Sequence, residues 1–198
     1  MTGLLLATTN PGKIREIEGI LNWIPITLVT LERFPGLPEP EETGETFAEN
    51  ARIKAMYYSE QTGLPAVADD SGLEIEALGN APGVHSARWH GTDYPTKFAA
   101  IYRELAARGL ETSAARFVAH ISLAHDGNIL YEATGIIQGE IAPEPKGSHG
   151  FGYDPIFFYP PYDCTLAEVD GAKKAAVSHR GKAFRQLRNW LESGQLAL

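Results

Sequence analysis

The chain has 198 residues, of which 43% are hydrophobic and 21% charged, close to the average of globular proteins, so wholesale disorder is excluded. Lys and Arg total 17 against 25 Asp and Glu, and the formal charge of −8 argues against nucleic acid or an anionic membrane as the main partner. No apolar run approaches the ~20 residues that span a bilayer, and the start lacks the features of a signal peptide. The single cysteine, Cys164, excludes an internal disulfide framework, so we expect a cytoplasmic protein.

Strand and helix signals alternate along the chain. Apolar or alternating runs predict strands over residues 3–8, 26–31, 66–68, 73–77, 116–125, 129–134 and 136–141. Helical spacing predicts helices from Pro11 onward, from 46 to about 61, from 96 to 108 and from about 181 to 192. The mixture indicates an α/β fold: one domain over residues 1–198 with an elongated mixed β-sheet flanked by helices.

The segment Thr8-Thr9-Asn10-Pro11-Gly12-Lys13 joins the first predicted strand to the first predicted helix. A helix N-terminus binds anions through free N–H groups and a partial positive charge. Lys13 adds a full charge, and Gly12 allows the backbone to approach a ligand closely. The segment is therefore a candidate phosphate site, although its spacing is not that of a Walker A loop. The alternative is an ordinary capped helix start with a solvated lysine.

Two groups of carboxylates could bind a metal. The first is an acidic loop with Glu39, Glu41, Glu42, Glu45 and Glu49. Mg²⁺ needs few protein carboxylates because waters and phosphate oxygens complete its shell; the alternative is a solvated loop. The second group is Asp69 and Asp70, which follow an apolar strand. Alternation points them to opposite sides, so one could hold a metal while the other orients or deprotonates water, unless both cap a turn.

Two further segments could recognise a base. Residues 147–155 contain three glycines within six positions, a composition that favours close backbone approach to a ligand, and a planar base could stack on Phe151 or Tyr153. Residues 173–182 concentrate four cations and His179 in an otherwise acidic protein, which suits a phosphate clamp or base reader. The alternatives are a flexible surface loop and basic residues that merely precede a helix.

Six motifs follow one another in a fixed order. They are Ala7–Lys13, Glu41–Gly44 with Phe47, Glu49–Ala51 and Lys54-Ala55, then Ala68–Leu73, Ala81–Arg88, Gly150–Phe157 and Ser178–Gly181. With these motifs the chain resembles the inosine triphosphate pyrophosphatase family, the Ham1-like non-canonical purine nucleoside triphosphate pyrophosphatases. One departure is Thr9, where members often carry Gly or Ser.

The resemblance implies that ITP, dITP and XTP are hydrolysed between the α and β phosphates to a monophosphate and pyrophosphate. It also implies a Mg²⁺ cofactor, a homodimer, and a two-lobed fold with the active site in a central cleft. A regulator that binds purine triphosphates without turnover is a rival hypothesis, although the carboxylates at Glu41, Asp69 and Asp70 argue against it. A modified pyrimidine triphosphate as substrate is a second alternative.

The resemblance also assigns roles to single residues. Expected triphosphate contacts are Thr8, Thr9, Asn10, Pro11, Gly12 and Lys13, with Lys54 assisting. Expected Mg²⁺ ligands are Glu41 and Asp70, and the expected general base is Asp70, with Asp69 as the alternative. Ser71 is expected to contact the substrate. The residues expected to enclose or contact the base are Phe151, Gly152, Tyr153, Asp154, Lys174, His179 and Arg180. We place the family's lysine at Lys174 rather than Lys173 because it lies five positions before His179.

Overall fold

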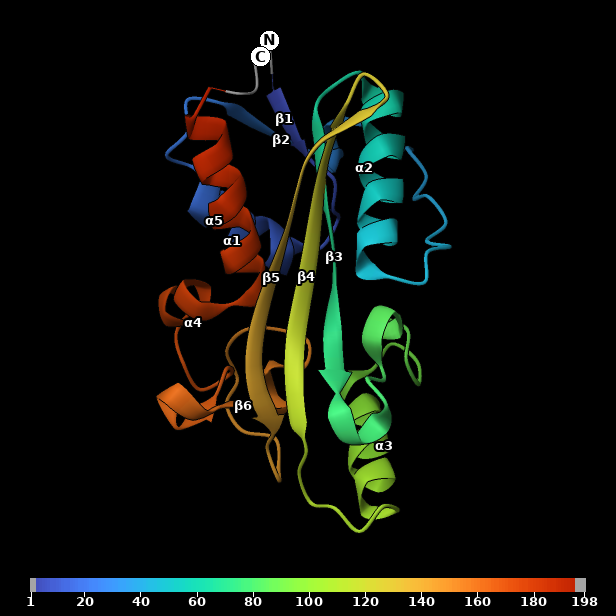
Figure 1. Ribbon diagram of the computed structural model, residues 1–198, viewed down its shortest axis with the longest axis vertical. Helices are drawn as coiled ribbons and strands as arrows, with labels where there is room; N and C mark the ends of the chain where they lie inside the picture. The colour runs from blue at the N-terminus through green and yellow to red at the C-terminus, as the bar shows by residue number, and fades with distance from the viewer. Residues whose placement is uncertain (1–2, 195–198) are drawn as a thin grey trace. The chain divides into compact units, whose positions relative to one another are not determined.

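A mixed seven-stranded sheet organises the computed structural model, which describes residues 3–194 (Figure 1). The strands are β1 (Gly3–Leu6), β2 (Thr27–Thr30), β3 (Ala66–Ile75), β4 (Ala114–His125), β5 (Asn128–Ile141), β6 (Phe157–Tyr159) and β7 (Cys164–Thr165). The helices are α1 (Pro11–Leu21), α2 (Phe47–Thr62), α3 (Tyr94–Ala106), α4 (Gly171–Val177) and α5 (His179–Glu192). The predicted α/β class is confirmed.

The sheet has the strand order β2-β1-β3-β4-β5-β6-β7. Strand β1 pairs in parallel with β2 and β3, whereas β6 pairs antiparallel with β5 and β7. The turn between β4 and β5 holds Asp126 and Gly127 at φ of 47° and 72°. Positive φ at both central residues is what a two-residue hairpin turn requires, so the predicted hairpin is confirmed.

The described chain forms two compact units. Residues up to Asp70, Ala119–Gly135 and the chain from His179 onward make up unit 1, and Ser71–Val118 with Ile136–Ser178 make up unit 2. Strands β3, β4 and β5 therefore contribute residues to both units. In unit 2 the core gathers around α3, β6 and the later part of β5, with Phe98, Ile101 and Phe157 among its buried residues.

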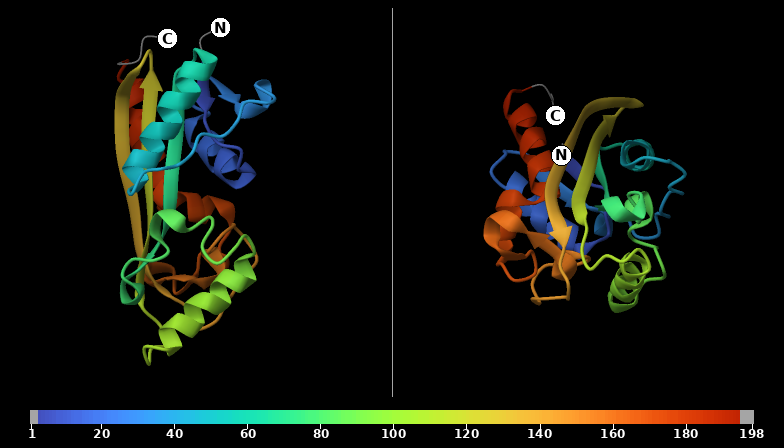
Figure 2. Two further views of the ribbon diagram at one scale, coloured as in Figure 1. Left: turned by 90° about the vertical axis from the view of Figure 1, so that its right-hand side faces the viewer. Right: turned by 60° about the horizontal axis from the view of Figure 1, so that its bottom comes forward.

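Strand β1 is buried on both faces in unit 1. Leu4 and Leu6 pack in one cluster with α1 and α5, while Leu5 and Ala7 pack in another with α2. The alternation of side chains along a strand thus places α2 on the opposite face of the sheet from α5 (Figure 2). Burial on both sides explains why this strand reads as a continuous apolar run.

Both helix starts with capping signals are confirmed. Asn10 is the N-cap of α1, and its side chain accepts hydrogen bonds from the backbone N–H groups of Gly12 and Lys13. Thr46 and Glu49 form a reciprocal capping box at the start of α2. Such caps satisfy N–H groups that have no partner within the helix, and they fix where the chain turns into it.

Several sequence predictions are wrong. The helix predicted over 96–108 is α3 at Tyr94–Ala106, and the strands predicted over 129–134 and 136–141 are one strand, β5. The strands predicted over 66–68 and 73–77 are one strand, β3, so Asp69 and Asp70 lie inside a strand rather than at its end, and Ala77 lies in a 3₁₀ helix. The basic segment 173–182 is largely helical, because Asp170 caps α4 by accepting the Lys173 N–H. Helix α5 begins at His179, two residues before the predicted start.

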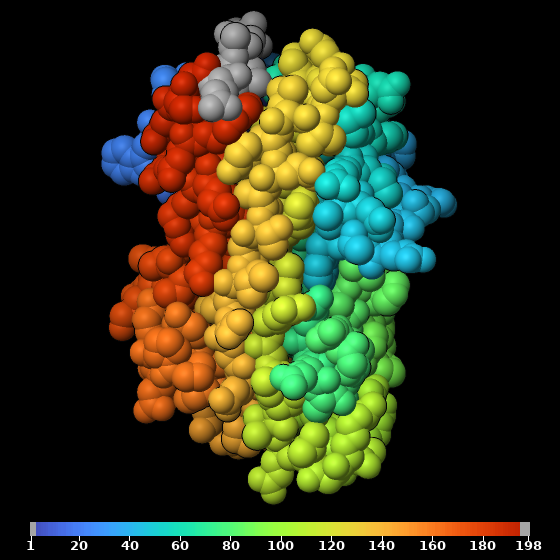
Figure 3. Space-filling model, in the orientation of Figure 1, coloured from blue at the N-terminus to red at the C-terminus, as the bar shows by residue number. Residues whose placement is uncertain are grey.

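The surface of the described residues shows two further features. Alternate side chains of β5 are exposed, and this strand runs along the face seen in Figure 3. Among residues 3–194, no helix combines the length and the apolar character that crossing a membrane would require.

Replacing Gly135 with alanine should destabilise the protein. A Cβ at Gly135 would collide with the backbone carbonyl oxygen of His179 and the N–H of Ala183, and backbone atoms of a packed helix cannot move aside as a flexible side chain can. We expect the free energy of unfolding in urea to fall by about 1–3 kcal/mol.

Gly19→Ala is the matched control, because Gly19 is an exposed position of α1 with open space around it. Alanine there should raise the free energy of unfolding by up to about 1 kcal/mol through helix propensity. Equal stability of Gly135→Ala and the unmodified protein would contradict the close packing of α5 on β5.

Candidate active site

The turn from β1 into α1 is organised by its own side chains. The Thr8 hydroxyl accepts the Asn10 N–H at 3.2 Å, and the Asn10 side chain in turn accepts the N–H groups of Gly12 at 2.8 Å and Lys13 at 3.2 Å. Pro11 occupies the first helical position, where it has no N–H to leave unsatisfied. The turn therefore presents the N-terminal end of α1 together with the Lys13 side chain, as an anion site requires.

Asp69 of β3 lies at the centre of a buried ion network in unit 1. The residue is 3% exposed, and its Oδ2 lies 2.9 Å from Lys13 Nζ and 3.1 Å from Arg180 Nε. Arg180, the second residue of α5, also contacts Glu16 of α1, with 2.6 Å between Nη1 and Oε2. The charges of the two cations and the two carboxylates cancel, and this compensation allows these charges to be buried.

The charges around Asp69 set its ionisation. Burial by itself raises the pKa of Asp69, but the neighbouring Lys13 and Arg180 outweigh burial and hold the pKa well below its ordinary value. Burial lowers the pKa of Lys13, although Asp69 opposes this effect. Asp69 is therefore a permanently charged carboxylate at neutral pH and a poor proton acceptor.

Asp70 lies among different partners. Asn50 Nδ2 donates to Asp70 Oδ2 at 3.2 Å, and Lys54 Nζ lies 3.3 Å from Asp70 Oδ1 and 2.7 Å from Glu42 Oε1. The predicted opposite orientation of Asp69 and Asp70 is thereby confirmed. Burial raises the pKa of Asp70, and so does the negative charge of Glu42, whereas Lys54 lowers it. The net result is a pKa above the ordinary value. The two adjacent aspartates thus differ in basicity.

Asn50 connects the acidic loop to Asp70, a role that the sequence analysis missed. It is 1% exposed, and its Oδ1 accepts the Gly44 N–H at 2.8 Å while its amide group donates to Asp70. A Cβ on Gly44 would lie 2.7 Å from Asn50 Oδ1, so only glycine fits there. The signal was present in the spacing, because Asn50 and Lys54 are four residues apart on one face of α2.

The glutamates of the acidic loop have different surroundings. Glu42 pairs with Lys54, Glu39 Oε1 accepts the Thr9 hydroxyl at 3.0 Å, and Glu41 is exposed. Among residues 3–194 no three His, Cys, Asp or Glu side chains are grouped as a protein-only metal cage. A cation that takes one or two carboxylates and completes its shell with water and phosphate fits the donors present.

In unit 2 the structure brings Phe151, Asp154 and Lys174 together. Lys174 Nζ lies 2.5 Å from Asp154 Oδ2 and 4.2 Å from the centre of the Phe151 ring. The same Asp154 oxygen accepts the Phe151 N–H at 2.8 Å. Gly150, at φ +73°, leaves no room for a Cβ beside Asp154. Lys174 is buried whereas Lys173 is exposed, which supports the choice of Lys174 made from spacing.

The remaining predicted residues are distributed between the units. Tyr153 is buried in unit 2, where its hydroxyl donates to the Ser86 carbonyl at 2.9 Å, and Gly152 is half-buried beside it at φ +70°. Ser71 is half-buried in β3 directly after Asp70, and His179 is buried at the start of α5. The roles assigned to these residues stay predictions.

Comparison with known proteins gives one consistent result. The sequence matches the Ham1 family over residues 4–190. It is 46% identical over 193 residues to the dITP/XTP pyrophosphatase of Geobacter sulfurreducens, covering 96% of this chain and 97% of the relative. It is 47% identical to a dITP/XTP pyrophosphatase of Thermus thermophilus, covering 93% and 89%. The structure of a HAM1 protein from Coxiella burnetii superposes with a TM-score of 0.89 at 42% identity, covering 98% of this chain and 100% of the other.

The two aspartates should respond differently to removal of their charge. Asp69→Asn leaves Lys13 and Arg180 buried with less compensating charge, so the free energy of unfolding at pH 7 should fall by about 3 kcal/mol or more. Asp70→Asn removes a carboxylate whose charged form burial disfavours and keeps an acceptor for Asn50, so stability should be unchanged or higher. Urea unfolding of the two variants checks this contrast.

The pH dependence follows from the lowered pKa of Asp69 in the folded state. A carboxylate with a lowered folded pKa stabilises the protein above the unfolded pKa of about 4 and loses this contribution as the pH falls. The deficit of Asp69→Asn relative to the unmodified protein should therefore shrink by about 1 kcal/mol between pH 4 and pH 3. A deficit that is constant with pH would contradict a charged Asp69.

Proposed function

Because the chain belongs to the Ham1 family, we propose that it hydrolyses the non-canonical purine nucleoside triphosphates ITP, dITP and XTP. Cleavage between the α and β phosphates releases the monophosphate and pyrophosphate and clears such nucleotides from the pool. The observation that carries the proposal is the mixed-charge cluster of unit 1, in which Lys13 and Lys54 lie beside Asp69 and Asp70 at the end of the β1–α1 turn. Triphosphate and a metal together need both signs of charge.

The triphosphate contacts in this proposal come from the β1–α1 turn. The residues Thr8 to Lys13 supply hydroxyl and N–H groups together with one ammonium group, and Lys54 supplies a second ammonium group. Both lysines are held in place by aspartates of β3, at 2.9 Å for Lys13 and 3.3 Å for Lys54. Holding a flexible side chain before the ligand arrives reduces the entropy lost on binding.

Glu41 and Asp70 are the proposed Mg²⁺ ligands. The metal, when bound, supplies positive charge that neutralises the phosphate oxygens. Glu41 is the exposed carboxylate of the Glu41-Glu42 pair, since Glu42 is engaged with Lys54. A site with two protein carboxylates suits Mg²⁺, which keeps several waters and binds through substrate phosphates.

Asp70 is the proposed general base, and the ionisation of the two aspartates supports this choice over Asp69. A base works best when its pKa approaches the operating pH. The pKa of Asp70 is raised and that of Asp69 is lowered. In the proposed reaction Asp70 accepts the proton of the attacking water as the bond between the α and β phosphates breaks. Asp69 acts as a positioning residue for Lys13.

The base contacts are proposed for the Phe151–Asp154 segment, with stacking on Phe151, and for Lys174, His179 and Arg180. The position of Lys174 beside Phe151 and Asp154 supports this assignment. Donors directed at the 6-oxo group of hypoxanthine or xanthine would face the 6-amino donors of adenine, and a polar mismatch of this kind can discriminate by about 10⁴. Ser71 is proposed to contact the substrate from its place next to Asp70. We further propose a cytoplasmic homodimer, as the family resemblance implies.

Pyrophosphate release from ITP, dITP, XTP, GTP and ATP, with and without Mg²⁺, tests the function. We expect Mg²⁺-dependent release from the first three and far slower release from GTP and ATP. Equal turnover of all five would contradict the base contacts, and turnover of modified pyrimidine triphosphates instead would replace the substrate class. Orthophosphate as the product would mean that another bond is cut.

Asp70→Asn should abolish turnover, with kcat at least ~10²-fold lower, while most dITP binding is retained, because the water loses its proton acceptor. Asp69→Asn is the comparison, and its expected effect is a raised KM through the loss of Lys13 positioning. Single-turnover kinetics with calorimetric binding measure both variants. If the unmodified protein binds dITP tightly but shows no turnover, the rival hypothesis of a regulator is favoured instead.

A further inference from the structure

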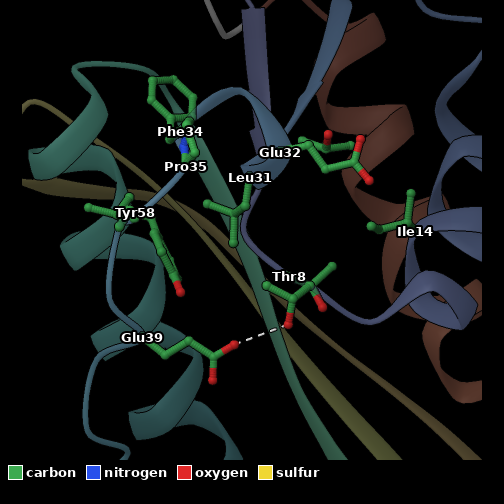
Figure 4. A pocket seen from close by; sticks show the side chains of 12 residues that line it. Thr8, Ile14, Leu31, Glu32, Phe34, Pro35, Glu39 and Tyr58 are labelled. Atoms are coloured by element: carbon green, nitrogen blue, oxygen red, sulfur yellow. Dashed lines mark hydrogen bonds between the residues drawn. The ribbon is translucent and has the colours of Figure 1, made fainter.

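A cavity of unit 1 lies next to the β1–α1 turn, Thr8 to Lys13, here called the phosphate turn after its proposed role. Most of the cavity's lining has no part in the chemistry proposed above. Its volume is about 260 Å³, and it is lined from the β1–α1 turn, the end of β2, the loop that follows β2, and α2 (Figure 4). It shares only Thr8 and Thr9 with the proposed triphosphate contacts. The volume lies just below the range of ~300–1,000 Å³ typical of small-molecule sites, so it suits a ligand smaller than a nucleoside triphosphate.

Tyr58 of α2 supplies the first indication of a ligand. The residue is 3% exposed, and its ring packs in the core of unit 1 against Tyr57. Within residues 3–194 its hydroxyl has no hydrogen-bond partner, and Figure 4 shows the ring directed along the cavity towards Glu39 and Thr8. The side chain is buried, but its hydroxyl oxygen is open to the cavity. The cavity therefore contains a polar position that a ligand atom would satisfy.

The other polar groups of the cavity accept hydrogen bonds. Glu39 accepts the Thr9 hydroxyl at 3.0 Å through one oxygen, and a carboxylate has further acceptor positions. Glu32 contributes a second carboxylate. No Lys, Arg or His is among the lining residues, so the cavity offers no cation to a phosphate group. The ligand it fits carries O–H or N–H donors and no negative charge.

The remaining wall is apolar. Leu31, Phe34 and Leu37 line the cavity and are partly buried against the unit 1 core. Such side chains can pack against a flat ring. The two carboxylates lie at opposite ends of the lining, with Leu31 between them (Figure 4). An apolar wall with a few convergent polar groups is the usual composition of a small-molecule site.

The cavity also lies at an edge of the sheet where ligands commonly bind. Strands β1 and β2 are parallel, so their carboxyl ends open at the same edge, with the phosphate turn after β1 and Glu32 just after β2. In open α/β sheets, ligands bind in the crevice outside the carboxyl ends of the strands.

We propose that this cavity is a second ligand site that binds a ribonucleoside without phosphates. The ribose hydroxyls donate to the carboxylate of Glu39, and the base lies against Phe34 and Leu31. The Tyr58 hydroxyl donates to an acceptor of the ligand. Since Glu39 also accepts from Thr9 of the phosphate turn, an occupied cavity is linked by one hydrogen bond to the proposed triphosphate contacts.

Calorimetric titration with adenosine, guanosine, cytidine and uridine tests the proposal. We expect saturable binding of at least one, weakened about fivefold in Tyr58→Phe, which removes only the hydroxyl, and tenfold or more in Glu39→Gln, which removes a charge-assisted acceptor. The 2′-deoxy form of the bound nucleoside should also bind more weakly. Absence of saturable binding for all four would overturn the proposal.

Tyr57→Phe is the matched control, because Tyr57 is the neighbouring residue in α2 but does not line the cavity. It should leave nucleoside binding unchanged, and near-UV circular dichroism checks that each variant is folded. Unchanged binding in both Tyr58→Phe and Glu39→Gln would overturn the proposal. So would loss of nucleoside binding in Phe151→Ala, because the nucleoside would then occupy the proposed substrate contacts.

The nucleoside-binding experiment can fail or succeed independently of the test of the proposed function. Pyrophosphate release by the unmodified protein reports on the reaction, whereas nucleoside titration reports on the cavity. Tyr58→Phe should leave KM for dITP unchanged, because within residues 3–194 no hydrogen bond joins the Tyr58 hydroxyl to a residue proposed to bind substrate or metal. A raised KM for dITP in that variant, with nucleoside binding unaffected, would make Tyr58 part of the substrate site and overturn the second site.

Discussion

The burial of Asp69 is the constraint on which the rest of unit 1 depends. A carboxylate inside a strand, away from water, is tolerated only when cations and hydrogen bonds compensate for the lost hydration. Lys13 and Arg180 supply that compensation from opposite ends of the sequence, and Glu16 balances Arg180. One buried charge thus fixes α1, β3 and α5 against one another and sets the place of the β1–α1 turn.

Adjacent positions in a strand then give two aspartates unlike properties. Asp69 faces the cations of α1 and α5, and Asp70 faces α2 with Asn50 and Lys54. The first is held ionised, and the second is the more basic. The strand's period of two residues, rather than any difference in residue type, separates the positioning role proposed for Asp69 from the chemical role proposed for Asp70. Placing both residues inside β3 also gives them the rigidity of a paired strand, which a turn would lack.

Close packing at glycine gives the loops around the site their conformations. Gly44 allows the acidic loop to approach Asn50, and Gly150 allows the loop before Phe151 to fold over Asp154. Each glycine lies beside a side-chain oxygen that accepts a backbone N–H. This oxygen occupies the space that a Cβ would otherwise fill. The glycines of these motifs are therefore structural requirements of the site and need not touch a ligand.

Local signals in the sequence determined the elements. Asn10-Pro11, the Thr46 and Glu49 pair, and Asp126-Gly127 act through neighbours within a few residues, so the helix starts and the hairpin could be predicted. The order of motifs also determined the family. Only the tertiary structure decided that β3 is continuous through its two aspartates and that Glu42 rather than Glu41 pairs with Lys54. The tertiary structure alone also showed that Arg180 pairs with Glu16 and that Tyr58 faces a cavity. Both arrangements depend on residues that are far apart in the sequence.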